Sequence, residues 1–200
     1  MKKKKKRGFN LKKEYIESWR YIKESKNFIY LAIGVFFASF ILAFFIQPSE
    51  TVLNYLFKFI QELLEKTQGM SASELIGFIF LNNFKSSFFG MVFGVVLGVF
   101  PILALIANGY VLGFVSSLSV VEGGIFSLWR ILPHGIFELP AIFISLGLGL
   151  KLGSFIFQKK KQESFRSFFQ NSLKVFLFIV IPLLIIAGII EGIFIFASGN

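Results

Sequence analysis

The sequence predicts an all-helical, polytopic membrane protein: a bundle of about five transmembrane helices with an amphipathic helix outside the bundle. Hydrophobic residues make up 55% of the chain, and the mean hydropathy is +0.73. Long uncharged runs recur at residues 27–49, 86–121 and 175–190. Because runs of this kind match the thickness of a bilayer, we expect the chain to cross a membrane several times.

Positive charge is concentrated in two segments that flank apolar runs. Residues 1–26 hold eleven Lys and Arg against three Glu, and residues 151–174 hold six against Glu163. Residues 47–75 have the opposite balance, two Lys against four Glu. The positive-inside rule therefore predicts a cell-membrane protein with both basic segments in the cytoplasm and residues 47–75 outside. Membrane lipids are the expected partner of this charge, and nucleic acid is not, because no recognition motif accompanies it.

The first 27 residues are predicted to be a basic cytoplasmic segment that ends in an interfacial helix. Four apolar side chains lie at helical spacing between charged ones: Tyr15, Ile16, Trp19 and Ile22. Residues 28–200 are predicted to form one transmembrane domain, whose first span covers about 28–46. An amphipathic helix over about 51–67 follows, too charged to cross the membrane. Ser71 and Glu74 then make the capping-box pattern that begins the second span.

The uncharged run from Ser86 to Val121 is too long for one crossing. As a single helix its 36 residues would extend about 54 Å, against a hydrocarbon core of about 30 Å. We expect two crossings that break at Pro101 or at Asn108-Gly109, or a re-entrant arrangement.

An odd number of crossings must separate an external segment from a cytoplasmic one. After the first span, the sequence therefore predicts crossings at about 76–99, 102–121, 131–150 and 173–196. This topology of five spans places the N-terminus in the cytoplasm and the C-terminus outside.

The most informative stretch is Pro133-His134-Gly135-Ile136-Phe137-Glu138-Leu139-Pro140. His134 is the single histidine of the chain, and in a helix it shares a face with Glu138, four residues later. Ionisable groups inside a membrane are costly and usually face a protein interior or a water-filled cavity. We expect them to form a polar centre with three further residues: Asn83, Asn108 and Glu191. This centre is either a structural, hydrogen-bonded cluster or a proton-carrying pair.

The polar residues lack the surroundings that enzymes and metal sites usually show. The chain has no cysteine and one histidine, which argues against zinc, since zinc usually takes several such ligands. No nucleophile or phosphate-binding loop accompanies the polar residues. We therefore expect no catalytic residue, no metal and no cofactor.

Glycines at a spacing of four residues predict close helix packing. They are Gly90, Gly94 and Gly98, then Gly109 and Gly113. Small residues at this spacing let helix backbones approach each other closely. This packing matters because lipid supplies no hydrophobic force that would hold the helices together. The same faces are open to an alternative interpretation, self-association into a homo-oligomer.

With these residues, the chain resembles the stage II sporulation protein M family. The resemblance rests on Pro133-His134-Gly135, Glu138-Leu139-Pro140-Ala141 and the glycines and asparagines above, in the same order and at similar spacing. It implies a five-span protein with a cytoplasmic N-terminus. It also implies a membrane scaffold that anchors two peptidoglycan-degrading partners during engulfment in spore-forming bacteria and is not itself the hydrolase.

We therefore interpret the protein as a non-enzymatic membrane scaffold that binds other membrane or envelope proteins. The main alternative is a small transporter or channel in which the polar centre lines a hydrated path. An accessible cavity that reaches the polar centre would favour transport, whereas a sealed, fully hydrogen-bonded cluster would favour the scaffold. An intramembrane enzyme with Glu138 as general base is a third, weaker interpretation.

Overall fold

The computed structural model describes residues 10–197, without the side chains of residues 130–134. It confirms the predicted fold class, because the described chain consists of helices joined by short turns, with no strand, and five helical stretches are long and apolar enough to cross a membrane. The elements are α1 Leu11–Glu24, α2 Lys26–Phe45, α3 Glu50–Thr67, α4 Ala72–Val92, η1 Phe93–Val95, α5 Val99–Gly123, η2 Ile125–Ile131, α6 Leu132–Gly153, η3 Ser154–Phe157, α7 Lys161–Val175, η4 Phe176–Val180 and α8 Ile181–Ala197.

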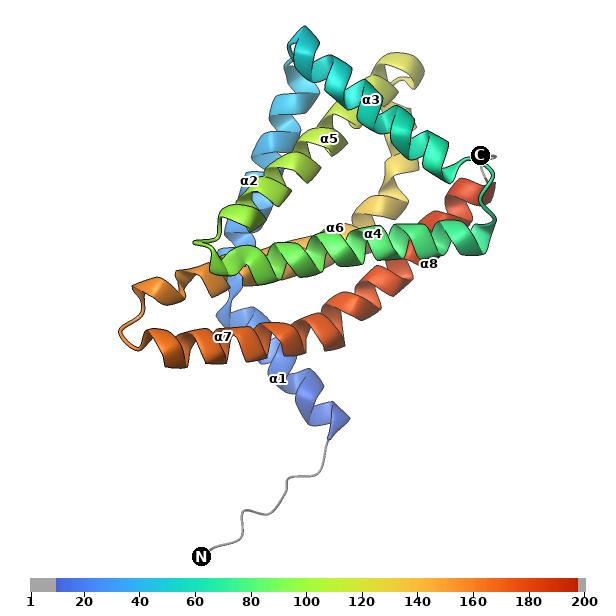
Figure 1. Ribbon diagram of the computed structural model, residues 1–200. Coiled ribbons are helices and arrows are strands. Elements are labelled where there is room, and N and C mark those ends of the chain that lie inside the picture. Colours follow the sequence, from blue (N-terminus) through green and yellow to red (C-terminus); the bar gives the residue numbers. More distant parts are fainter. Residues whose placement is uncertain (1–9, 198–200) are drawn as a thin grey trace, which may run out of the picture.

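The elements outside the spans gather at two opposite ends of the molecule (Figure 1). At one end, called the basic end here, lie α1, η3 and α7 with the lysines and arginines of residues 11–26 and 151–174. At the other, called the α3 end, lie α3, η2 and the last turns of α8. The chain runs between the two ends in α2, α4, α5, α6 and α8, which continues from α7 through η4. The two basic segments are therefore on the same side of the bundle, with α3 on the opposite side.

The turn between α4 and α5 lies close to Pro101, the first of the two predicted breaks, and not at the second. Asn108 and Gly109 are in the interior of α5, so the predicted break there is wrong. The chain turns at residues 96–98, where Leu97 has φ of 56° and Gly98 has φ of 73°. Pro101 follows in the first turn of α5, where a missing N–H costs no helical hydrogen bond. The proline therefore begins the span and does not interrupt it, and α5 starts at Val99, not at about 102.

Close backbone contacts at glycines hold the spans together. Gly109 and Gly113 of α5 lie against the backbone of Phe36 and Phe40 of α2. Two more glycines lie against α6, Gly94 at the backbone of Gly149 and Gly90 at the Leu146 side chain. These glycines, like Gly98 in the turn, therefore serve contacts within one chain. Gly135 makes no such approach, because a Cβ added there would meet only Cδ1 of Leu139, at 3.8 Å.

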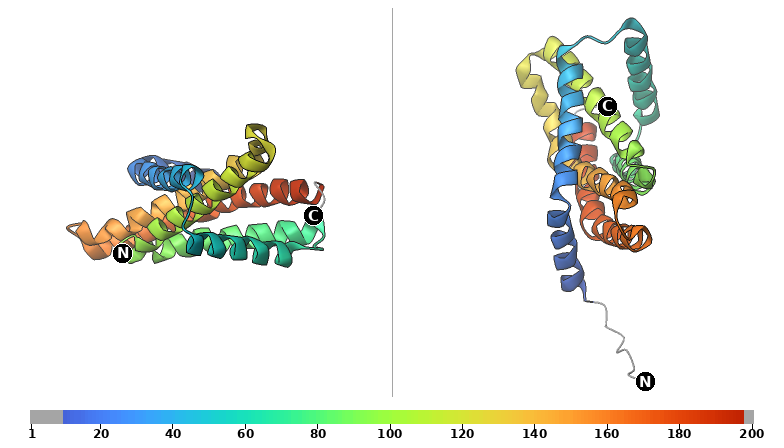
Figure 2. Two further views of the ribbon diagram at one scale, coloured as in Figure 1. Left: turned by 90° about the horizontal axis from the view of Figure 1, so that it is seen from above. Right: turned by 90° about the vertical axis from the view of Figure 1, so that its left-hand side faces the viewer.

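Helix α6 runs through the middle of the bundle, in contact with α2, α4, α5 and α8 (Figure 2). Most of its residues after Pro140 are buried, up to Gly153. Ser145 is fully buried, and its Oγ donates a 2.7 Å hydrogen bond to the Ser87 carbonyl of α4. The motif-bearing helix is thus the core of the molecule, which fixes the position of Glu138 relative to the other spans.

The amphipathic helix α3 lies across the end of the bundle (Figures 1 and 2). The Ser71 backbone N–H donates to the Glu74 carboxylate at 2.8 Å, so the predicted capping box ends the α3–α4 turn. Leu56, which is buried, packs with Ala43 of α2 and Phe114 of α5. The Phe57 and Phe114 rings meet with their centroids 5.8 Å apart. Much of the rest of α3 is exposed, so this helix rests on α2 and α5 and stands away from α4.

Helix α1 is held against α7 by a shared lysine. Nζ of Lys174 contacts the carboxylates of Glu14 at 2.6 Å and Glu17 at 2.8 Å. The hydrogen bond from Lys174 holds the pKa of Glu17 below its usual value. Away from α7, α1 exposes Trp19, whereas the partly exposed Tyr15 ring packs against Phe178 with the centroids 6.4 Å apart.

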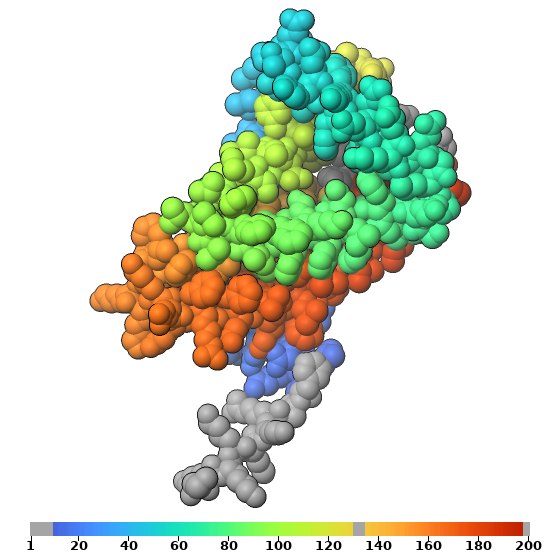
Figure 3. Space-filling model, viewed as in Figure 1, coloured from blue at the N-terminus to red at the C-terminus, as the bar shows by residue number. Residues whose placement is uncertain are grey.

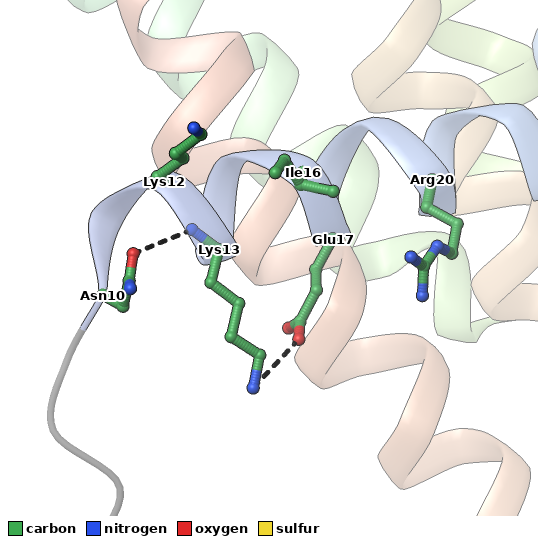
Figure 4. A pocket seen from close by; sticks show the side chains of 6 residues that line it. All are labelled: Asn10, Lys12, Lys13, Ile16, Glu17 and Arg20. Carbon is green, nitrogen blue, oxygen red and sulfur yellow. Dashed lines mark hydrogen bonds and ion pairs between the residues drawn. The ribbon is translucent and has the colours of Figure 1, made fainter.

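A shallow pocket of about 360 Å³ lies along α1 (Figure 4). All of its lining residues belong to α1 or its N-cap: Asn10, Lys12, Lys13, Ile16, Glu17 and Arg20. It is therefore a groove on one helix surface and not a site between elements.

Helices α7 and α8 form one rod, in which a π-helical turn, η4, joins the two α-helices. Pro182 has no N–H to donate to the carbonyl of Phe178, so the α-helical ladder is broken at this point. The sequence predicts the last span from about 173, whereas the helix extends back to Lys161. The rod joins the basic end, at Lys174, to the α3 end, at Glu191.

Candidate functional site

A cavity of about 840 Å³ lies between α3 and the spans α4, α5, α6 and α8. The space-filling view shows the hollow on this face, bordered by α3, α4 and α5 (Figure 3). Two carboxylates and three amides line it: Glu138, Glu191, Asn82, Asn83 and Asn108. The other lining side chains are mainly apolar and come from α3, α5 and α8: Tyr55, Leu56, Phe59, Leu63, Ala107, Val111, Leu112, Val115, Phe194 and Ile195.

The cavity brings together four of the five residues of the predicted polar centre. Glu138 of α6 is only 2% exposed, and Glu191, Asn83 and Asn108 are half-buried. They come from four different spans, so no local sequence pattern holds them together. The side chains of His134 and of Pro133 lie outside the described residues. Asn82, the neighbour of Asn83, also lines the cavity.

The amides at the cavity are partly engaged with the protein itself. Nδ2 of Asn108 donates to the Ala104 carbonyl at 2.8 Å, one turn back in α5. Nδ2 of Asn82 points to Oδ1 of Asn83 at a long 3.5 Å. An amide has two donor hydrogens and a carbonyl with two lone pairs, so a single bond leaves capacity for a ligand.

The lining combines two carboxylates and three amides with a mainly apolar wall. Its described residues include no Ser, Thr, Cys or Lys that could act as a nucleophile beside the carboxylates. No group of three or more His, Cys, Asp or Glu in the described chain could hold a metal ion. What the site offers is a set of hydrogen-bonding groups at the bottom of an apolar recess, the usual design of a small-molecule site.

On the basic side of the polar residues, the spans are packed tightly. Gly149 of α6 fits against Gly90 and Met91 of α4 and Pro101 of α5; a Cβ on it would lie 3.0 Å from the Gly90 oxygen and 2.8 Å from Cγ of Pro101. Gly153 likewise meets the backbone of the 94–98 turn. Among the described lining residues, Asn82, Asn83, Ala107 and Asn108 lie near the middle of α4 and α5, whereas Glu138 and Glu191 lie in the halves of α6 and α8 nearer α3. The cavity is therefore associated with the α3 end.

Lys151 forms a second buried polar site, near the basic end. In the sequence it belongs to the basic segment of residues 151–174. Lys151 of α6 is 8% exposed, and its Nζ donates to Oγ of Ser25 at 2.9 Å. The same ammonium lies 3.9 Å from the centre of the Tyr21 ring and 5.4 Å from that of Phe168. Burial raises the pKa of Tyr21 to about 12, so this ring stays neutral. Lys151 therefore joins α6 to the α1–α2 junction and to α7.

The polar centre, the glycine contacts and the central α6 agree with a known family of membrane proteins. The model of the family described as stage II sporulation protein M matches residues 30–194, which include every lining residue of the cavity named above except Ile195. The chain belongs to the stage II sporulation protein M family. A relative in this comparison is an uncharacterized protein of Methanocaldococcus jannaschii, 27% identical over 183 residues, which are 86% of this chain and 82% of the relative. No solved structure matches the chain.

Membership in the stage II sporulation protein M family makes the chain a multi-pass membrane protein of that family. The archaeal relative matches most of this chain, so sequences of this kind are not confined to spore-forming bacteria. The family name alone therefore does not assign a sporulation role to this chain.

Proposed function

We propose that this protein is a non-enzymatic transporter that binds its ligand in the cavity under α3. The observation that supports the proposal is the cavity itself, which reaches the carboxylates of Glu138 and Glu191 from the α3 end. Ionisable groups at such positions commonly mark substrate or proton paths in membrane proteins. A sealed polar cluster would have favoured a purely structural centre.

The proposed transport cycle needs a second state of the bundle. In the present state the cavity belongs to the α3 end, and the glycine contacts around Gly149 close the basic side. Alternating access would require those contacts to open while α3 or the outer halves of the spans close over the ligand. With the basic end in the cytoplasm, as the positive-inside rule predicts, the present state opens outward.

Cysteine labelling tests this cycle, because the chain has no cysteine of its own. Ala107 lines the cavity beside Asn108, and Leu103, one turn earlier on α5, is 56% exposed on the surface of the span. An Ala107→Cys variant should react with a membrane-impermeant maleimide applied from either side of sealed vesicles. The Leu103→Cys control should react from neither side. Labelling of Ala107→Cys from the α3 side alone, under all conditions of ligand and pH, would contradict transport.

The scaffold that the family resemblance implies is the second candidate, and α3 is the feature that favours it. Val52 and Leu64 are exposed on this helix by 39% and 63%, beyond the contacts that hold it to α2 and α5. Apolar side chains on a helix at the membrane surface suit the docking of another envelope protein. Under this proposal the partners would be peptidoglycan-degrading enzymes, as for the family's sporulation members.

Photo-cross-linking separates the scaffold from the transporter. A benzoyl-phenylalanine placed at Leu64 should capture a peptidoglycan-degrading enzyme in the native membrane. The same group at Ile41, which is 53% exposed on α2, serves as the control on a span surface. Capture at both positions alike, or of lipid alone, would contradict a scaffold that docks its partner on α3.

A further inference from the structure

The polarity of the cavity lining changes in one direction along the spans. On α5, Asn108 is followed toward the α3 end by Val111, Leu112 and Val115. At 1.5 Å per residue, Val115 lies about 10 Å nearer to that end than Asn108. On α8, Glu191 is likewise followed by Phe194 and Ile195. Both helices thus place the polar residue deep and the apolar residues toward the mouth.

Helix α3 adds only apolar or aromatic side chains to the mouth. Tyr55, Leu56, Phe59 and Leu63 line the cavity, whereas Lys58, Glu62 and the other charged residues of the helix do not. A fully polar solute would leave this mouth unmatched, and a fully apolar ligand would strip water from the floor without replacing its hydrogen bonds. An amphiphile with its polar head at the floor satisfies both parts of the lining.

The chemistry of the floor selects the head group. Glu138 and Glu191 place carboxylates in the lining, and a carboxylate is an acceptor with about four lone-pair sites that several donors can share. An amine head donates several hydrogen bonds and carries the complementary charge. A volume of about 840 Å³ is in the range of sites that enclose one small molecule, which favours a single chain over a two-chain phospholipid.

We propose that the cavity binds a single-chain amphiphilic amine, with its head among Asn83, Asn108, Glu138 and Glu191 and its chain along α3 and the outer part of α5. The inference rests on the proposed function in taking the cavity as the ligand site. It adds the class of ligand and the direction in which the ligand lies.

Trp129 provides a reporter next to the proposed chain site. Its ring meets Phe194, a lining residue, with the centroids 5.4 Å apart. The other tryptophan, Trp19, lies on α1 at the opposite end and is removed by Trp19→Phe. In lipid nanodiscs, a dodecylamine brominated on its chain should quench Trp129 in a saturable way. A brominated dodecyl sulfate at the same mole fraction should give only weak, linear quenching.

Two variants probe the two halves of the site separately. Glu138→Gln should weaken the saturable quenching by about tenfold or more, the expected effect of losing a charge-assisted hydrogen bond. Val115→Phe, which leaves the polar floor unchanged and narrows the mouth, should also weaken it. Equal quenching by amine and sulfate, or equal affinity in all variants that fold, would overturn the inference.

Competition with a short amine separates two outcomes: that the amphiphile is the wrong class of ligand, and that the protein does not transport. Ethylamine lacks the chain and should not displace the brominated amphiphile even at a tenfold excess. If it does, the amphiphile is the wrong class. If Ala107→Cys is nevertheless labelled from both sides, transport of a small amine stands. If Ala107→Cys is labelled from one side only, transport fails, while saturable quenching would still establish the amphiphile site.

Discussion

Gly94→Ala should lower the thermal unfolding temperature of the detergent-solubilised protein by about 5–10 °C. A Cβ at this position would overlap the carbonyl and Cα of Gly149, which are backbone atoms in the buried centre of α6. Backbone cannot rotate away as a flexible side chain can, so η1 and α6 must separate. Overpacking of this kind costs about 1–3 kcal/mol, and in lipid no hydrophobic force pushes the separated helices together again. For a chain of this size each kcal/mol corresponds to about 2–4 °C.

The matched control lies in the same span, which consists of α4 and η1. A Cβ on Gly77 of α4 would have no heavy atom within 4 Å. Gly77→Ala should therefore leave the unfolding temperature unchanged or raise it, because alanine favours a helix by about 1 kcal/mol over glycine. The measurement is fluorescence-detected size-exclusion chromatography after heating. Equal unfolding temperatures for Gly94→Ala and Gly77→Ala would show that the contact between Gly94 and Gly149 does not hold the spans together.

Tyr21→Leu should destabilise the protein by about 2 kcal/mol or more, because the Tyr21 ring of α1 stabilises the buried ammonium of Lys151 in α6. The Lys151 ammonium lies over the Tyr21 ring, and a cation that is shielded from water gains about 2 kcal/mol from such a ring. Removing the ring leaves the ammonium buried with Ser25 as its hydrogen-bond partner and with the more distant Phe168 ring. The Glu24 carboxylate also attracts the ammonium, so the charge would be left only partly compensated, and this makes loss of the ring costly.

A double-mutant cycle isolates this contact. Lys151→Met removes the charge and keeps the volume, so alone it should cost less than Tyr21→Leu, since an apolar replacement of a buried charge is often nearly neutral. In the double variant, the penalty of Tyr21→Leu should shrink, because no charge remains to be stabilised. The readout is again the unfolding temperature. Additive effects of the two substitutions would contradict a direct interaction between Lys151 and Tyr21.

The fold was predictable because each signal for it is local. The apolar runs that became spans, the charged helix at residues 51–67 and the Ser71–Glu74 cap depend on short windows of sequence. The turn at residues 96–98 was not predictable in the same way, since Leu97 adopts a positive φ that L-residues other than Asn and Asp rarely favour. Pro101 looks like a break in the sequence, but a proline is equally at home in the first turn of a helix.

The candidate site was predictable in its polar residues and not in its shape. Glu138, Glu191, Asn83 and Asn108 stand out because each is polar inside an apolar run. The cavity between them depends on how far α3 stands from α4, which no sequence window records. Burial of Lys151 was not predictable for a related reason: it follows the apolar run of α6 directly and so resembles the start of the basic segment, whereas the packing of α1 and α7 buries it.

The π-helical turn η4 sets the rotational phase of the last span. A π turn accommodates one residue more than an α turn, and one residue corresponds to about 100° around a helix axis. If residues 176–180 were regular α-helix, every side chain of α8 would point about 100° away from its present direction relative to Lys174. Glu191 would then turn from the cavity, and Gly192 from Ile76 of α4. A single irregular turn thus decides which face of α8 the cavity meets.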